Sequence, residues 1–187
     1  MASRIEPLLT VADLDAYPDD NGNRYELIGG ELFVSCAPGI PHQRVVQNLS
    51  VGISLYLKAN PIGILVPGAG AIFSDYDAVI PDIAFVRNER WDEVVTGEKF
   101  TGAVDLVIEV LSPGAANRRR DLSAKRGLYG KYGVQEYWIV DTQNLSVLVF
   151  RLEGPTLQEI ATLIGDDELT STVLPSFRLK VKTIFNI

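Results

Sequence analysis

Apolar residues recur along the chain with two different spacings, which predict helices in some segments and strands in others. Residues 41–59 have apolar side chains at helical spacing, and the Asn60-Pro61 pair ends this helix. Residues 117–132 are expected to form a second helix that ends at Gly133 in a left-handed cap. Short apolar segments are typical of strands near residues 62–66, 70–75, 82–87, 105–111 and 136–141.

The order of these elements predicts a mixed sheet. Residues 24–34 should form a hairpin that turns at Gly29-Gly30. Strand 105–111, helix 117–132 and strand 136–141 follow one another as in a parallel crossover unit. Residues 142–187 alternate apolar residues with turns, so we expect antiparallel strands that extend the sheet. The predicted fold class is α/β (α+β), with a mixed central β-sheet flanked by helices.

A chain of 187 residues is long enough to bury a substantial core, and we expect a single domain. Its parts would be an N-terminal helix and hairpin at 1–40, a core at 41–141, and C-terminal antiparallel strands at 142–187. The chain has no apolar run of about 20 residues, no evident secretory signal and one cysteine, Cys36. The sequence therefore favours a cytoplasmic protein without a membrane span.

The net charge of −7 argues mildly against a general nucleic-acid-binding protein, but the charge is distributed unevenly. Residues 117–132 carry a net charge of +5, which leaves −12 for the rest of the chain. This basic segment could hold a polyanion near a metal site, or it could be an ordinary solvated helix face.

Two acids and a lysine are the strongest candidates for chemistry. Glu109 is a carboxylate in the middle of the apolar run 105–111, where an ionised group is costly unless it is paired or binds a metal. Asp82 opens the strand-like segment 81–86, and Lys125 follows on the predicted helix. Two acids on neighbouring strands with a nearby lysine are the groups that metal-dependent phosphodiester cleavage requires.

The cation suited to these oxygen ligands is Mg²⁺ or Mn²⁺. We predict that Asp82 and Glu109 bind it together with water and the main-chain carbonyl of Val110. Lys125 would orient the attacking water or offset the charge that builds on the phosphorus centre.

Each of these residues also has a structural interpretation. Asp82 could cap or turn the chain after Pro81, and Glu109 could be neutralised by a buried arginine. Lys125 lies four residues after Asp121, which is the spacing of an ordinary helical ion pair. Spacing alone does not choose between the two interpretations.

Two further residues are candidates to line the same cavity. Glu26 is a lone acid in the first hairpin, where a surface role is equally compatible with the sequence. His42 lies at the start of the first long helix, where a histidine is more often a hydrogen-bonded structural residue than a ligand or base. A serine or cysteine nucleophile would have to use this one histidine, and neither a Gly-x-Ser-x-Gly elbow nor a P-loop is present.

At these residues the chain strongly resembles the Uma2 family of proposed restriction endonucleases, over nearly its whole length. The resemblance rests on segments 25–32, 41–43, 81–86, 106–113 and 133–141, with Asp121, Lys125 and Tyr129. The family looks like a branch of the PD-(D/E)xK nuclease superfamily, which implies a restriction-endonuclease-like core.

The resemblance also implies roles for individual residues. It assigns Asp82 and Glu109 as metal ligands and Glu26 as an additional acid. The lysine that the superfamily places two residues after the glutamate is replaced here by Leu111. Comparison with the family suggests that Lys125 has taken over its role.

The sequence is compatible with three functions. The first is a Mg²⁺-dependent nuclease that cuts DNA, and the second is a catalytically silent nucleic-acid-binding or regulatory protein that keeps the fold. The third is a structural homodimer whose C-terminal strands pair with those of another copy. A DNA substrate, a homodimer and the absence of a membrane partner are the expected associations.

Overall fold

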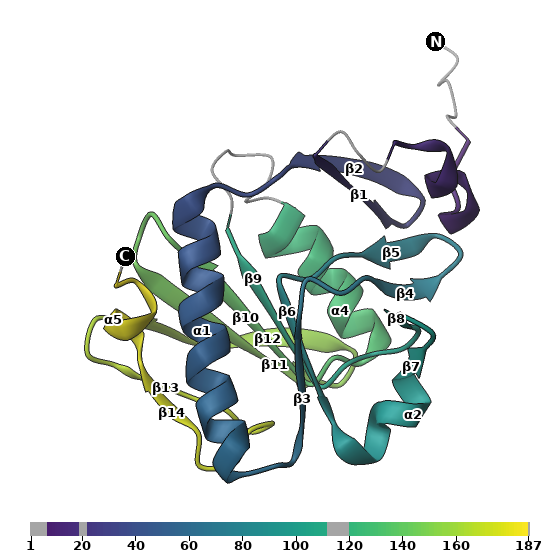
Figure 1. Cartoon of the computed structure of the whole chain (residues 1–187). Helices are drawn as coiled ribbons and strands as arrows, with labels where there is room; N and C mark the ends of the chain where they lie inside the picture. Colours follow the sequence, from purple (N-terminus) through teal and green to yellow (C-terminus); the bar gives the residue numbers. More distant parts are fainter. Residues whose placement is uncertain (1–6, 19–21, 112–119, 187) are drawn as a thin grey trace.

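A computed structural model of the chain describes residues 7–18, 22–111 and 120–186, and in these ranges two six-stranded sheets account for most strands (Figure 1). Sheet A contains, in spatial order, β2 (Glu31–Cys36), β1 (Asn23–Ile28), β5 (Asp77–Val79), β4 (Ala71–Ser74), β8 (Lys99–Phe100) and β7 (Val95–Thr96). Sheet B contains β12 (Thr156–Ile164), β11 (Ser146–Glu153), β10 (Glu136–Asp141), β9 (Leu106–Val110), β6 (Ile83–Arg87) and β3 (Gly63–Pro67). The mixed α/β fold class predicted from the sequence is confirmed.

Sheet B contains the predicted parallel crossover. Strands β9 and β10 pair in parallel, and the π-helical turn η3 (Arg120–Lys125) and helix α4 (Arg126–Tyr132) lie between them in the chain. β11 and β12 then extend the sheet antiparallel, as expected. The strands β13 (Glu168–Thr170) and β14 (Arg178–Lys180) differ from the prediction, because they pair with each other in a separate small sheet.

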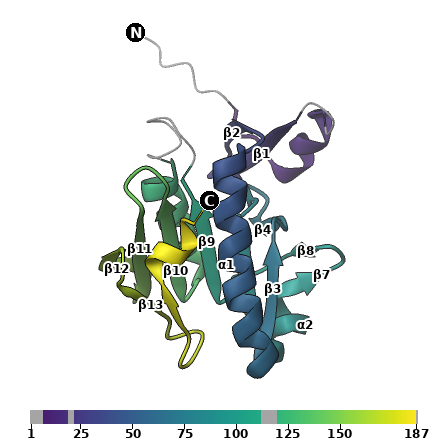
Figure 2. The ribbon, with the colours of Figure 1, turned by 60° about the vertical axis from the view of Figure 1, so that its left-hand side comes forward.

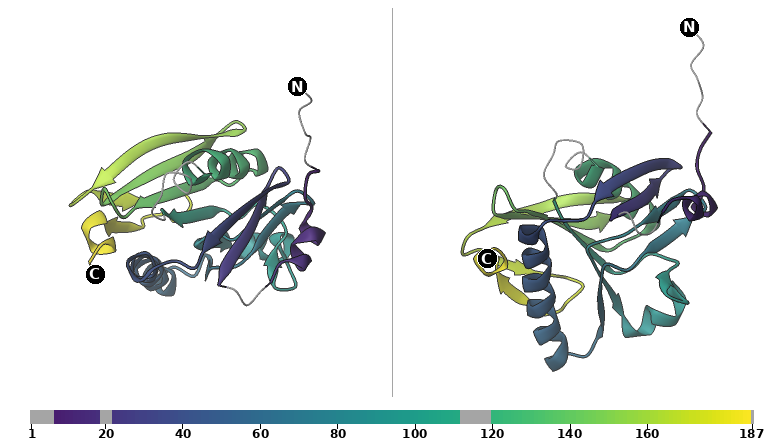
Figure 3. Two further views of the ribbon diagram at one scale, coloured as in Figure 1. Left: turned by 90° about the horizontal axis from the view of Figure 1, so that it is seen from above. Right: turned by 45° about the horizontal axis from the view of Figure 1, so that its top comes forward.

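The alternation of side chains along sheet B builds a hydrophobic core on each of its faces. On one face, Ile108 and Trp138 pack with the long helix α1 (Ile40–Ala59) and with α5 (Val181–Ile184). Figure 2 shows α1 running across this face with α5 beside it. On the other face, Val107 and Ile139 pack with α4 (Figure 3, left). Glu109 therefore belongs to the α4 face, because it lies two residues from Val107.

The helix ends follow their sequence signals. Thr10 and Asp13 form a capping box at the start of the short 3₁₀ helix η1 (Val11–Ala16). The helix α4 ends at Gly133, whose φ of 90° gives the predicted left-handed cap, and the Val134 N–H donates to the Tyr129 carbonyl. Within the described ranges, no helix has both the length and the apolar character needed to cross a membrane.

Helix α4 contains two glycines, Gly127 and Gly130, and one of them lies close to the backbone of a neighbouring segment. A Cβ at Gly130 would lie 3.2 Å from both the Leu157 nitrogen and the Pro155 oxygen of the β11–β12 turn. A Cβ at Gly127 would have nothing within 4 Å. Gly130 therefore lets α4 pack directly on the backbone of β12.

The segment 88–103, for which the pattern of apolar residues predicts no helix or strand, contains regular structure. It forms the 3₁₀ turn η2 (Asn88–Arg90), the single helical turn α2 (Trp91–Val94), and the two-residue strands β7 and β8. These elements and the three-residue strand β5 are too short to show a period of two, so the pattern of apolar residues does not reveal them. Strands β5, β7 and β8 complete sheet A, which the sequence did not predict as a separate sheet.

Asp77 connects sheet A to α4. Its buried carboxylate accepts hydrogen bonds from the Gly29 N–H at 2.6 Å, the Tyr132 hydroxyl at 2.7 Å and Lys131 Nζ at 3.0 Å. Burial alone would raise the pKa of Asp77, but these donors outweigh it and hold the pKa below its ordinary value. Asp77 thus stabilises the fold in its ionised form.

Asp77→Asn should lower the free energy of unfolding at pH 7 by about 1–3 kcal/mol, because the buried carboxylate accepts four hydrogen bonds, the fourth from the Ser74 hydroxyl. A lowered folded-state pKa stabilises the protein above the ordinary pKa of about 3.9, and this contribution is lost as pH falls through the folded value. The difference between wild type and variant should therefore shrink between about pH 5 and pH 3. Urea denaturation across this range measures it.

The matched control is Asp75→Asn, which changes an exposed acid in the same turn and should have an effect within about 0.5 kcal/mol. A deficit of Asp77→Asn that stays constant down to pH 3 would contradict the assignment.

Candidate active site

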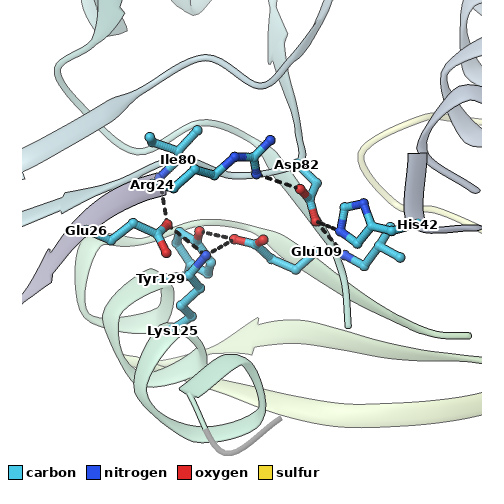
Figure 4. Close-up of polar contacts among 9 residues, drawn as sticks. Arg24, Glu26, His42, Ile80, Asp82, Glu109, Lys125 and Tyr129 are labelled. Carbon is cyan, nitrogen blue, oxygen red and sulfur yellow. Dashed lines mark hydrogen bonds and ion pairs between the residues drawn. The ribbon is translucent and has the colours of Figure 1, made fainter. Parts of the chain in front are cut away.

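The six residues singled out from the sequence lie together. They line one small cavity of about 20 Å³, where β1 of sheet A meets β6 and β9 of sheet B and the first turn of α1 (Figure 4). The predicted residues are Glu26, His42, Asp82, Glu109, Val110 and Lys125. The side chains come from segments as far apart in the chain as β1 and η3, so the fold brings them together.

Pairing between β6 and β9 explains why the two principal acids are neighbours. Ile83 lies opposite Ile108 in this antiparallel pair. The register, continued by one residue, places Asp82 opposite Glu109. Directly opposed residues in antiparallel strands have Cα atoms about 4.5–5.5 Å apart. In agreement, Asp82 Oδ2 accepts the N–H of Val110 at 2.8 Å.

Asp82 is held by groups from three elements. His42 Nε2 of α1 lies 3.1 Å from Oδ2, and Arg24 Nη1 of β1 lies 3.1 Å from Oδ1. Burial alone would raise the pKa of Asp82, but the hydrogen bond and charge of His42, the Val110 N–H and the charge of Lys125 outweigh it. The pKa of Asp82 is therefore below its ordinary value, and the residue is a carboxylate at neutral pH.

Lys125 joins the other two acids. Its Nζ lies 2.9 Å from Glu109 Oε1 and 2.9 Å from Glu26 Oε1, and all three side chains are buried. The interpretation of Glu26 as a surface residue is therefore wrong. Asp121, the alternative partner of Lys125, has a side chain outside the part of the chain that the structure describes.

Two residues of the site were not given a role from the sequence. Arg24 lies two residues before Glu26 on β1, and the period of two puts both side chains on one strand face. Tyr129 lies four residues after Lys125, on the same helical face. Its hydroxyl donates to Glu109 Oε1 at 2.7 Å, and burial together with the charge of Glu109 raises the pKa of Tyr129 well above 10. In the sequence, the spacing of Arg24 from Glu26 and of Tyr129 from Lys125 could have indicated that both residues belong to the site.

The residues present suit a divalent cation that prefers oxygen ligands. The described residues contain no group of three or more His, Cys, Asp and Glu side chains that could hold a metal ion by themselves. Mg²⁺, however, usually takes one or two protein carboxylates and keeps several waters, which Asp82 and Glu109 could supply between them. A cavity of about 20 Å³ is also large enough for one water-sized particle.

Comparison with known protein families identifies the class of protein to which the chain belongs. The model of the Uma2 family, described as "Putative restriction endonuclease", matches residues 11–182. The chain belongs to the Uma2 family.

Comparison with solved structures supports the same fold. One similar structure is that of a protein described as a "putative nuclease belonging to DUF820" from Anabaena variabilis ATCC 29413. It has a TM-score of 0.77 and 20% sequence identity, and the match covers 95% of this chain and 97% of that one. At this identity the likeness establishes the fold alone. No curated protein matches the chain.

Lys125→Met should lower the free energy of unfolding in EDTA at pH 7 by about 3–5 kcal/mol, because two buried carboxylates lose the cation between them. Adding Glu26→Gln to this variant should restore part of the loss, since it removes one of the two negative charges. Denaturant unfolding of the single and double variants measures the effect.

Lys58→Met, at an exposed lysine near the end of α1, provides the control and should stay within about 0.5 kcal/mol of wild type. If Lys125→Met is as stable as this control, the ammonium does not hold the two acids.

Proposed function

We propose that this protein is a metal-dependent endonuclease that hydrolyses phosphodiester bonds in DNA. The observation that carries the proposal is the convergence of Asp82 and Glu109, from adjacent strands, in one cavity with Lys125. Membership of the Uma2 family supports the same activity. The resemblance to the PD-(D/E)xK superfamily adds a reason to expect DNA as the substrate.

In this proposal Asp82, Glu109 and the carbonyl of Val110 hold one Mg²⁺ or Mn²⁺ ion. When bound, the ion would polarise the phosphate and lower the pKa of a coordinated water. His42 and Arg24 orient the Asp82 carboxylate, while Tyr129 orients that of Glu109. The hydrogen bonds of these neighbours fix the two carboxylates in place before substrate arrives.

Lys125 has the catalytic role of compensating charge. Its ammonium is within hydrogen-bonding distance of Glu109 and Glu26, so it can shift from these acids towards the phosphate as negative charge builds there. Glu26 holds the lysine on the side away from Glu109, and its Oε1 also accepts the Ile80 N–H at 2.8 Å. This contact fixes Glu26 between the two sheets.

One observation favours the catalytically silent alternative. The ammonium group of Lys125 donates a hydrogen bond to an oxygen of Glu109. A metal ion that binds Glu109 must therefore compete with Lys125 for that carboxylate. A nucleic-acid-binding protein that keeps the fold would retain this ion pair permanently. Homodimer formation through the C-terminal strands and a cytoplasmic location stay predictions.

A plasmid-nicking assay in Mg²⁺ or Mn²⁺ tests the proposal. Wild type should cut, EDTA should abolish cutting, and Asp82→Asn, Glu109→Gln and Lys125→Met should each cut at least about a hundredfold more slowly. The first two weaken the binding of the metal ion, and the third removes the charge that compensates the phosphate. The variants should be compared at a temperature where unfolding measurements show all of them folded.

The controls are Glu31→Gln and Lys58→Met, which change exposed charges outside the cavity and should cut like wild type. Equal cutting by all the proteins would identify a contaminating nuclease. DNA binding that weakens with salt, without any cleavage, would support the silent alternative.

A further inference from the structure

A second, larger cavity adjoins the acid cluster. Its volume is about 430 Å³, and it lies between η1 and strands β1, β4 and β5 of sheet A. Arg24 and Ile80 line both cavities, so the two share a wall. The roles proposed above leave this larger cavity without a function.

The cavity exists because two neighbouring strands diverge. β1 and β5 are paired at Leu27 and Ala78. Beyond this pair, the Ile80 N–H donates to the Glu26 side chain instead of to the backbone of β1. Residues 23–25 and 78–80 then line the cavity from opposite sides. Backbone at the edges of diverging strands offers hydrogen-bonding groups of both kinds to a ligand.

The lining combines apolar walls with positive charge. The apolar residues of the lining include Val11 and Leu14 of η1 and Ile72 and Val79 of the sheet. Tyr25 also lines the cavity, and its ring packs 4.8 Å from the ring of Tyr17. Two cations line the cavity, the partly exposed Arg24 and the exposed Lys99, against one acid, Asp15. The volume of the cavity is in the range of about 300–1,000 Å³ that is typical of binding sites for small organic groups, and polar and apolar atoms share its surface about equally.

We propose that this cavity is a nucleotide subsite, which takes one unpaired nucleotide next to the phosphate that the acid cluster attacks. The proposal rests on the nuclease function proposed above, and it adds that the nucleotide beside the attacked phosphate is unpaired, as in a single strand or a locally opened duplex. A base stacked in a duplex cannot enter a concave cavity, whereas an unpaired base can turn into it. The apolar walls and Tyr25 receive the base.

Arg24 has the position to connect the two sites. Its guanidinium contacts Asp82 on one side, and its side chain is 30% exposed. A guanidinium can bind a carboxylate and a phosphate oxygen at the same time, because its donors point in several directions. A strand whose phosphate reaches the acid cluster would therefore pass Arg24 before its neighbouring base enters the cavity.

Fluorescence anisotropy with three labelled probes tests the subsite: a 12-nucleotide DNA single strand, the RNA of the same sequence, and the matching DNA duplex. Binding is measured in EDTA and in Ca²⁺, which prefers the same oxygen ligands as Mg²⁺. At least one single strand should bind more tightly than the duplex, and the two single strands distinguish DNA from RNA. Leu14→Trp, which fills the cavity, and Lys99→Glu should each weaken that binding about tenfold, as loss of a stacked base does.

The controls match each change. Ala12→Trp adds the same ring to an exposed residue of η1 outside the lining, and Lys58→Glu reverses an exposed charge on α1. Both should bind like wild type. Tighter binding of the duplex, no binding of either single strand, or equal binding by cavity variants and controls would overturn the subsite.

Cleavage measured in parallel separates this proposal from the one on which it rests. Single-strand binding that depends on Leu14 and Lys99, without cleavage in Mg²⁺ or Mn²⁺, would support the subsite and contradict the nuclease. Metal-dependent cleavage that Leu14→Trp and Lys99→Glu leave unchanged would support the nuclease and overturn the subsite.

Discussion

The ammonium group of Lys125 lies between Glu26 of one sheet and Glu109 of the other, 2.9 Å from each carboxylate. Buried carboxylates are costly without such compensation, so the packing of the two sheets and the charge of the site are coupled. Asp82 has its own partners, Arg24 and His42. The small cavity therefore gathers three acids that are held by side chains from β1 and from two helical elements, α1 and η3.

Much of this arrangement was predictable, because it follows from the spacing of apolar residues. Glu109 interrupts a strongly apolar strand, and a carboxylate there must have a partner. The Lys125 assignment rested on resemblance to a family, since Asp121 offered an equally good helical partner. The sequence does not reveal the role of Arg24, because an arginine on a hairpin strand is usually solvated and its contact with Asp82 forms only when the two sheets pack together.

Sheet A was harder to predict for a physical reason. Its strands β5, β7 and β8 have two or three residues each, and tertiary contacts hold them in place. Asp77 illustrates this, because its carboxylate connects three segments that are distant in the chain. The divergence of β1 from β5, and so the larger cavity, likewise depends on side-chain contacts that leave no periodic signal. The acid cluster and the cavity beside it are thus products of the same junction between sheets.

If Asp82 and Glu109 share one divalent ion, anomalous diffraction from a crystal soaked in MnCl₂ will locate it. One anomalous peak is expected about 2.1 Å from an oxygen of each carboxylate, a distance typical of small octahedral cations. A crystal of Glu109→Gln treated in the same way should lack the peak. A wild-type map with Lys125 in its present position and no peak at these carboxylates would contradict a shared ion.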